Sequence, residues 1–360
     1  METGAFALPP ACADIAARVE ETLQAFLAVQ RTEVIGVDPG AAPAFDELER
    51  TVASGGKRLR PVFCCLGFLA AGGDLGPPIL SAAAALELLH TFAVVHDDVM
   101  DRSPTRRGVP TTWVHLAETH RRRRLRGDPE VYGISAAVLV GDLAIALADQ
   151  AFLGSGFEPG PLMSGMERYN RMRTEMVAGQ FLDVQASQQA GLDEPAARRI
   201  AVLKSGVYTV EGPLHIGVVL GEGSLRLLDP LTEYGVALGE AFQLRDDVLG
   251  LFGDPQVTGK DRHSDLLEGK RTVPMARAVA AASPEDRAFL EERLGHADLT
   301  AKEVERMRAI VRSSGALEGT LELIDGLGGR ARGALEHAAL PGSVRDLLAQ
   351  MVEALAARPM

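Results

Sequence analysis

The sequence predicts an all-α protein, and three observations support that prediction. Apolar residues recur with helical periodicity along most of the 360 residues. No segment of strand length shows a convincing Val/Ile/Thr alternation. Hydrophobic residues make up 46% of the chain but aromatic residues only 5%, and the apolar share is rich in Ala, Leu and Val. This mixture suits close-packed helices better than a sheet.

The helices should follow one another along the chain, separated by breaks at glycine and proline clusters. Such clusters stand at residues 72–74, 76–78 and 158–161. No low-complexity linker or clear repeat divides the chain, so we expect a single domain over residues 1–360. In chain order, the expected helices cover about 12–32, 44–54, 58–71, 78–101, 132–153, 161–190, 194–207, 209–221, 229–250, 270–282, 284–294, 300–313, 316–337 and 342–357.

The charge and the chain start narrow the class of protein. A net charge of −12 argues against a nucleic-acid or anionic-membrane binder, so an anionic ligand would need a local basic cluster or a metal. The cysteines Cys12, Cys64 and Cys65 form no disulfide framework, which indicates a reducing compartment. There is no signal peptide pattern and no uncharged apolar stretch of about 18 residues. We therefore expect a soluble, cytoplasmic protein without a membrane span.

The helix expected at 78–101 holds the most informative polar residues. It is apolar nearly all round, so it should be buried, and buried charge is costly unless it is paired or metal-bound. His90, Asp97 and Asp101 fall on one stripe of this helix, and Asp98 joins the same side. Three carboxylates at a helix end suit a hard divalent cation such as Mg²⁺. A capped, solvent-facing acidic helix end is the alternative.

Basic residues stand near this acidic motif in the sequence. Arg106 and Arg107 follow it, and guanidinium groups beside a metal site suit a diphosphate that bridges metal and arginine. The run GGKRLR at 55–60 begins a helix; its glycines allow close backbone approach, and Lys57 and Arg60 add charge. This run is not a P-loop. A plain basic loop is the alternative there.

A second acidic pair, Asp246 and Asp247, ends the apolar helix expected at 229–250. Gln243 lies on the same helical face as both. The following loop again mixes acid and base: Lys260, Asp265, Lys270 and Arg271. Two such segments on separate helices would hold a metal cluster if they faced each other across a bundle.

Together and in this order, these segments resemble the trans-prenyltransferases, the polyprenyl diphosphate synthase family. The match runs from about Gly55 to Thr272 and comprises GGKRLRP, LLHTFAVVHDDVMD, RRG, GDL, GQFLD, KSGVYT, FQLRDD, TGK and EGKRT. Each motif alone is weak, but the ordered set is specific. The resemblance implies a helical bundle around a large central cavity, the isoprenoid synthase fold, usually as a homodimer. Helices at about 12–54 would pack on this bundle or on the partner subunit.

The resemblance also implies a cofactor and individual roles. The cofactor would be Mg²⁺, about three ions per active site. The metal ions and the allylic diphosphate would be held by Asp97, Asp98, Asp101 and Asp246, with Asp247 nearby. The same diphosphate would contact Arg106, Lys204, Lys260 and Lys270. Isopentenyl diphosphate would bind Lys57, Arg60, His90 and Arg107. Further polar residues of the site would be Gln180, Ser205 and Gln243.

The second acidic motif departs from the family pattern. It often reads Asp-Asp-x-x-Asp, whereas Gly250 stands at the last place here. Position 250 therefore cannot bind metal directly. Because Asp246 and Asp247 remain, and members with glycine there look active, we still expect an active enzyme.

The implied reaction needs charge stabilisation more than a strong base. Metal and basic residues would neutralise the leaving diphosphate so that the allylic C–O bond ionises. The double bond of isopentenyl diphosphate would attack the cation, and the proton would leave to the departing diphosphate. An apolar cavity would protect the cation from water.

Product length is predicted from the helix below the aspartates. Ala93 lies one turn beneath Asp97, Phe92 lies beside it, and Leu89 lies a turn deeper. In the family, large side chains at these places form a floor. One bulky and one small residue predict geranylgeranyl diphosphate, with farnesyl or longer products as alternatives. Phe92 is otherwise an ordinary core residue, with the floor elsewhere.

Three other functions are compatible with parts of this pattern. A class I terpene cyclase shares the fold but usually lacks the isopentenyl-binding set and carries a different second motif. A di-iron bundle needs two Glu-x-x-His motifs, and only residues 87–90 provide one. A non-catalytic subunit would have lost the acidic motifs.

The arginine-rich segment Arg121–Arg126 is interpreted as a solvated insertion. Contact with a partner or steering of the substrate is the alternative role for it.

Overall fold

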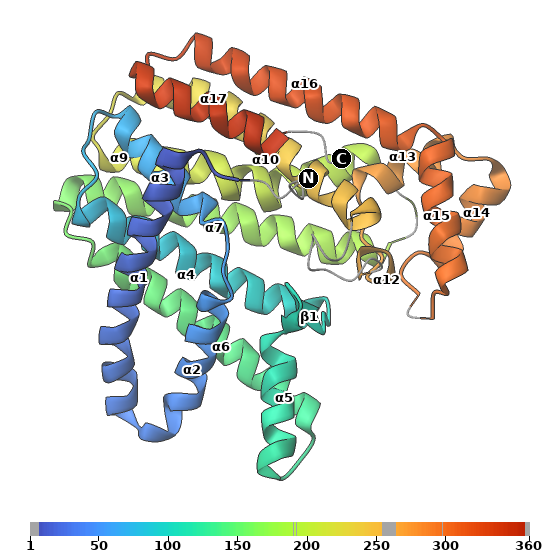
Figure 1. Cartoon of the computed structure of the whole chain (residues 1–360), viewed down its shortest axis with the longest axis horizontal. Coiled ribbons are helices and arrows are strands. Elements are labelled where there is room, and N and C mark those ends of the chain that lie inside the picture. Colours follow the sequence, from blue (N-terminus) through green and yellow to red (C-terminus); the bar gives the residue numbers. More distant parts are fainter. Residues whose placement is uncertain (1–6, 190, 192, 254–263, 297, 357–360) are drawn as a thin grey trace.

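The computed structural model describes residues 7–356 without 190, 192, 254–263 and 297, and this part is almost wholly helical (Figure 1). The all-α prediction is confirmed. In chain order the elements are α1 (Pro10–Val37), η1 (Pro39–Ala41), α2 (Ala42–Ala53), α3 (Leu59–Ala70), α4 (Pro77–Met100), β1 (Thr105–Arg106), β2 (Val109–Pro110), α5 (Thr112–Arg123), α6 (Pro129–Leu153), α7 (Pro159–Ser187), α8 (Glu194–Ala201), η2 (Val202–Glu211), α9 (Gly212–Leu220), η3 (Leu225–Leu227), α10 (Leu228–Phe252), α12 (Ser264–Leu267), α13 (Val273–Ala281), α14 (Pro284–Arg293), α15 (Ala301–Ser313), α16 (Ala316–Glu336) and α17 (Gly342–Ala356).

Helix α4 is the central element and carries the first acidic motif at its C-terminal end. Residues 82–89 are all buried, because a helix that is apolar on every face must be surrounded. Pro77 begins the helix, where its missing N–H costs nothing. Helices α1, α3 and α6 pack against α4, while α16 and α17 lie along α10 (Figure 1).

The chain between α4 and α6 is more ordered than the sequence analysis expected. Strands β1 and β2 pair as a short antiparallel hairpin whose two-residue turn is Arg107-Gly108. Both turn residues have positive φ, 52° and 76°, which is typical of a type I′ turn. The hairpin leads into α5, a helix that was not predicted. The arginine-rich segment Arg121–Arg126 forms the exposed end of α5 and the turn after it.

The segment that carries Lys204 and Ser205 is a π-helix, η2. Helices α8, η2 and α9 follow one another without the break expected near residue 208. Helix α10 approaches η2 closely: a Cβ atom on Gly239 would lie 2.3 Å from the Cα atom of Gly206, so only glycine fits there. π-helical turns interrupt regular helices most often at functional sites.

Candidate active site

A cavity of about 900 Å³ opens among the α2–α3 loop, α4, the hairpin, α7, η2 and α10. Most of the site residues predicted from the sequence line it: Lys57, Arg60, His90, Phe92, Ala93, Asp97, Asp98, Arg106, Arg107, Gln180, Lys204, Ser205, Gln243 and Asp246. The fold therefore brings together segments that lie nearly 190 residues apart in the chain, by the numbering of Lys57 and Asp246. Lys260 lies outside the described residues.

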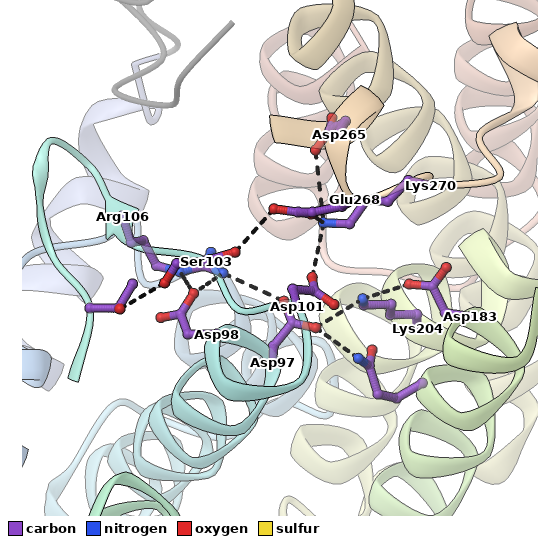
Figure 2. Close-up of polar contacts among 12 residues, drawn as sticks. Asp97, Asp98, Asp101, Ser103, Arg106, Asp183, Lys204, Asp265, Glu268 and Lys270 are labelled. Carbon is purple, nitrogen blue, oxygen red and sulfur yellow. Dashed lines mark hydrogen bonds and ion pairs between the residues drawn. The ribbon is translucent and has the colours of Figure 1, made fainter. Parts of the chain in front are cut away.

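Asp97 is the most heavily contacted carboxylate of the first motif. It accepts hydrogen bonds from Gln180 (2.8 Å) and Lys204 (3.2 Å), and Arg106 lies 3.5 Å away (Figure 2). Burial would raise the pKa of Asp97, but the charges of Lys204, Lys270 and Arg106 outweigh it and lower the pKa to about 2. Asp97 is therefore ionised throughout the physiological range.

The other two aspartates of the motif each pair with one cation. Arg106 donates to Asp98 at 2.8 Å, and the ammonium of Lys270 lies 3.1 Å from Asp101 (Figure 2). Burial raises the pKa of both carboxyls, and the cations oppose that rise. Asp101 does not line the cavity itself. Each carboxylate of the motif is thus paired with a basic side chain.

The second motif presents one residue to the cavity and keeps one buried. Asp246 lines the cavity. Asp247 is buried and accepts a hydrogen bond from Gln243 at 2.8 Å, and burial raises the pKa of Asp247 to about 7. The carbonyl of Gln243 in turn accepts a hydrogen bond from the hydroxyl of Ser205. This chain of contacts joins η2 to α10 beneath the cavity.

A second set of basic residues, Lys57, Arg60 and Arg107, lines the same cavity as the acidic motifs. The guanidinium of Arg60 lies 4.2 Å from the ring centroid of Tyr208 and donates to Thr209 at 2.9 Å. Burial, and then the charge of Arg60, lowers the pKa of His90 well below its ordinary value, so its ring is neutral. Its Nδ1 atom is buried without a hydrogen-bond partner among the described residues. Such a group is suited to an anionic, hydrogen-bonding ligand.

The donor chemistry at the acidic motifs fits a hard divalent cation. The available ligands are carboxylate oxygens, which Mg²⁺ prefers. Among the described residues, no three acidic, cysteine or histidine side chains already form a metal-binding group. The reason is visible in Figure 2, where lysine and arginine hold the carboxylates. A cation bound here would have to displace these ion pairs.

The structure adds residues that the predicted set lacked. Asp183 lies 2.8 Å from the ammonium of Lys204, and Glu268 lies 2.7 Å from that of Lys270 (Figure 2). A signal for Asp183 exists in the sequence, because it lies three residues after Gln180 on one face of α7. The predicted residue Leu89, in contrast, is fully buried and does not line the cavity.

Comparison with known proteins places these features in a family. Residues 44–311 match the family model described as polyprenyl synthetase. Geranylfarnesyl diphosphate synthase of Aeropyrum pernix is 32% identical over 271 residues, which cover 74% of this chain and 79% of that protein. Geranylgeranyl diphosphate synthase of Mycobacterium tuberculosis is 32% identical over 305 residues, covering 84% and 80%. The crystal structure of geranylgeranyl pyrophosphate synthase from Corynebacterium glutamicum, complexed with isoprenyl diphosphate and magnesium, matches with a TM-score of 0.93 at 34% identity, over 96% of this chain and 99% of that one.

Proposed function

Since the chain belongs to the polyprenyl synthetase family and is a chain-elongating prenyltransferase, we propose that it condenses isopentenyl diphosphate with an allylic diphosphate to give geranylgeranyl diphosphate. The observation that supports this most strongly is the arrangement of the cavity. Carboxylates of both acidic motifs, Asp97, Asp98 and Asp246, line the same cavity as two sets of cations, Arg106 with Lys204 and Lys57 with Arg60 and Arg107. Two diphosphates can therefore bind in one cavity, with the apolar wall between and below them.

The proposed metal ions, about three per site, supply positive charge to the departing diphosphate. In this proposal the oxygens of Asp97, Asp98, Asp101 and Asp246 hold the ions, with Asp247 nearby. Arg106, Lys204 and Lys270 move from these carboxylates onto the diphosphate oxygens. Lys260, outside the described residues, joins them. Such prearranged charge lowers the barrier to breaking the allylic C–O bond.

The second set of basic residues in the cavity positions the second substrate. Lys57, Arg60 and Arg107 hold the diphosphate of isopentenyl diphosphate, and His90, whose Nδ1 atom has no hydrogen-bond partner among the described residues, lines the same cavity. The double bond then attacks the allylic cation, a new C–C bond forms, and the proton lost from the adjacent carbon is taken by the departing diphosphate. Phe92 and other apolar lining residues keep water from the cation.

The proposed product length rests on the wall beneath Asp97. Phe92 and Ala93 both line the cavity, so a growing chain passes them. The ring of Phe92 lies 4.6 Å from that of His96, which limits its movement. One bulky and one small residue leave more depth than two aromatics, which supports geranylgeranyl over farnesyl diphosphate. Longer products, as the name of the Aeropyrum pernix relative indicates for that protein, are the second candidate.

An exposed apolar surface on α6 supports the proposal of a homodimer; a cytoplasmic location is proposed with it. Helices α4 and α6 are both long and apolar enough to cross a membrane by length and composition, but α4 is the core helix. Only 39% of the apolar window of α6 is buried. Val131 and Leu139, both on α6, are 63% and 64% exposed. Burial of such a face by a second copy is the usual solution in soluble oligomers.

The proposed activity is tested by incubating the protein with Mg²⁺, isopentenyl diphosphate and dimethylallyl, geranyl or farnesyl diphosphate. The products are dephosphorylated and their chain lengths measured by chromatography. We expect linear geranylgeraniol as the main alcohol. No elongation with any primer would overturn the proposal, and a cyclic hydrocarbon formed directly from the allylic primer would indicate a terpene cyclase instead.

A further inference from the structure

Gly250 stands where the second acidic motif lacks its last aspartate, and another carboxylate fills the space beside it. A Cβ atom built on Gly250 would lie 1.9 Å from Oδ2 and 3.0 Å from Cγ of Asp265. Atoms that are not bonded do not approach so closely. The carboxylate of Asp265 therefore occupies the position that a side chain at residue 250 would take.

The backbone around Asp265 fixes this placement. Asp265 belongs to the short helix α12 and is buried. Its carbonyl oxygen accepts a hydrogen bond from the backbone N–H of Lys270 at 3.0 Å. Leu266, the next residue, packs in the same apolar cluster as Leu251, the residue after Gly250. The two segments are thus anchored side by side, so the contact between Gly250 and Asp265 is a feature of the packing.

The charge of Asp265 also reaches both acidic motifs. Its Oδ1 atom lies 3.8 Å from the ammonium of Lys270, which in turn contacts Asp101 of the first motif (Figure 2). Its Oδ2 atom lies against Gly250, the last position of the second motif. On α10, position 250 lies one turn after Asp246 and on the same side.

We propose that Asp265 supplies the third carboxylate of the second acidic motif, entering from α12 in place of a side chain at position 250. This inference rests on the proposed function, because the ligand it helps to hold is the complex of a divalent cation with diphosphate. In this proposal, the absence of a side chain at Gly250 leaves space for a carboxylate from a different part of the chain. The alternative is that Asp265 only balances the charge of Lys270.

Moving the carboxylate between the two positions tests the proposal. Asp265→Asn removes the charge at constant size, and Gly250→Asp alone creates an overlap with Asp265. The double variant Gly250→Asp/Asp265→Gly returns one carboxylate to the same space from α10. Binding of Mn²⁺ in the presence of inorganic diphosphate, measured by the electron paramagnetic resonance signal of free Mn²⁺, gives a readout that needs no turnover.

We expect Asp265→Asn to weaken Mn²⁺ binding by about tenfold, the loss typical of removing a supporting group at a metal site. The double variant should recover most of that loss relative to Asp265→Gly. Glu268→Gln is the matched control. Glu268 also contacts Lys270 at 2.7 Å, but the carboxylate beside Gly250 is that of Asp265. Equal effects of Asp265→Asn and Glu268→Gln, or wild-type affinity in Asp265→Asn, would overturn the proposal.

The design separates this inference from the proposed function. If the double variant fails to fold, as judged by circular dichroism, the comparison of Asp265→Asn with Glu268→Gln still decides. A protein that binds Mn²⁺ with diphosphate through Asp265 but elongates no primer would refute the proposed reaction and leave the carboxylate assignment intact. Normal elongation with unchanged Mn²⁺ binding in Asp265→Asn would refute the carboxylate assignment and leave the proposed reaction intact.

Discussion

The guanidinium of Arg58 donates to the carboxylate of Glu87 at 2.5 Å, and both side chains are buried. Arg58 also donates to Glu20 at 2.8 Å and to the carbonyl of Val52 at 2.9 Å. Its backbone has a φ of 48°, directly after Lys57. Arg58 therefore ties α1, α2 and α4 together at the wall of the cavity, which its neighbour Lys57 also lines.

Replacing Arg58 by lysine should disturb this arrangement without removing the charge. An ammonium cannot reach three partners in fork geometry, so Glu87 is left poorly paired in a buried place. We expect a lower melting temperature and a KM for isopentenyl diphosphate raised by roughly tenfold, an effect of about 1.4 kcal/mol. The KM for the allylic substrate should change less. Arg31→Lys, in a half-exposed ion pair, is the control. Destabilisation with an unchanged KM would show that Arg58 has a structural role alone.

The contact between Gly239 and Gly206 predicts a large effect from adding one methyl group. Gly239→Ala places a Cβ atom 2.3 Å from the Cα atom of Gly206, so α10 and η2 must separate. Overpacking of this kind costs about 1–3 kcal/mol. Because η2 carries Lys204 and Ser205, kcat should also fall. Gly326→Ala in α16 meets nothing within 4 Å and should stabilise the protein slightly. Thermal melts and steady-state rates of both variants check this pair.

Product length should respond to Phe92 and not to Leu89. Phe92→Ala opens the wall of the cavity, so chromatography should show products longer than those of the wild-type protein. Leu89→Ala removes a fully buried side chain that does not line the cavity, and should lower the free energy of unfolding by about 2–5 kcal/mol at unchanged product length. Unchanged products from Phe92→Ala would place the floor elsewhere.

His215 should make the folded protein sensitive to acid. Burial lowers the pKa of His215 from 6.5 to about 4, and its Nε2 donates to the carbonyl of Leu228 at 3.1 Å. Below pH 6.5, His215 is protonated in the unfolded chain but stays neutral in the folded protein. The free energy of unfolding therefore decreases as the pH falls towards 4. At pH 5 the loss is roughly 2 kcal/mol.

The variant His215→Gln removes this proton uptake and therefore tests whether His215 lowers the stability at acidic pH. Melting temperatures at pH 7.5 and 5 should differ less for His215→Gln than for the wild-type protein. His296→Gln, at a half-exposed position, should behave like the wild type. An identical drop in all three proteins would assign the acid sensitivity to other groups.

The fold class could be predicted from the sequence because its signals are local, and most residues predicted for the site line one cavity in the structure. A helix that is apolar on every side must be the core, and polar residues at its end must meet a ligand or a counter-charge. The helix α5 was missed because its segment is polar and arginine-rich. Its buried face consists of Thr112, Leu116, Ala117 and His120, and two of these four are polar, so hydrophobic periodicity detects it poorly.

The remaining features depend on contacts between distant parts of the chain. The pairing of Arg58 with Glu87 and the approach of Gly239 to Gly206 bring different helices together. Neither leaves a periodic pattern in the sequence. The contact between Asp265 and Gly250, which the proposal above interprets as a substitute for the missing carboxylate, is of the same kind.

The ion pairs at the first acidic motif also have a thermodynamic consequence. Lys204 and Lys270 already neutralise Asp97 and Asp101, so a divalent cation alone gains little by replacing them. A diphosphate alone would likewise have to draw these lysines away from their carboxylates. In the proposed complex with both ligands, the lysines would pair with the diphosphate and the carboxylates with the cation. Each ligand must then raise the affinity of the other by the same factor, as reciprocal linkage requires. The site is in effect selective for the pair.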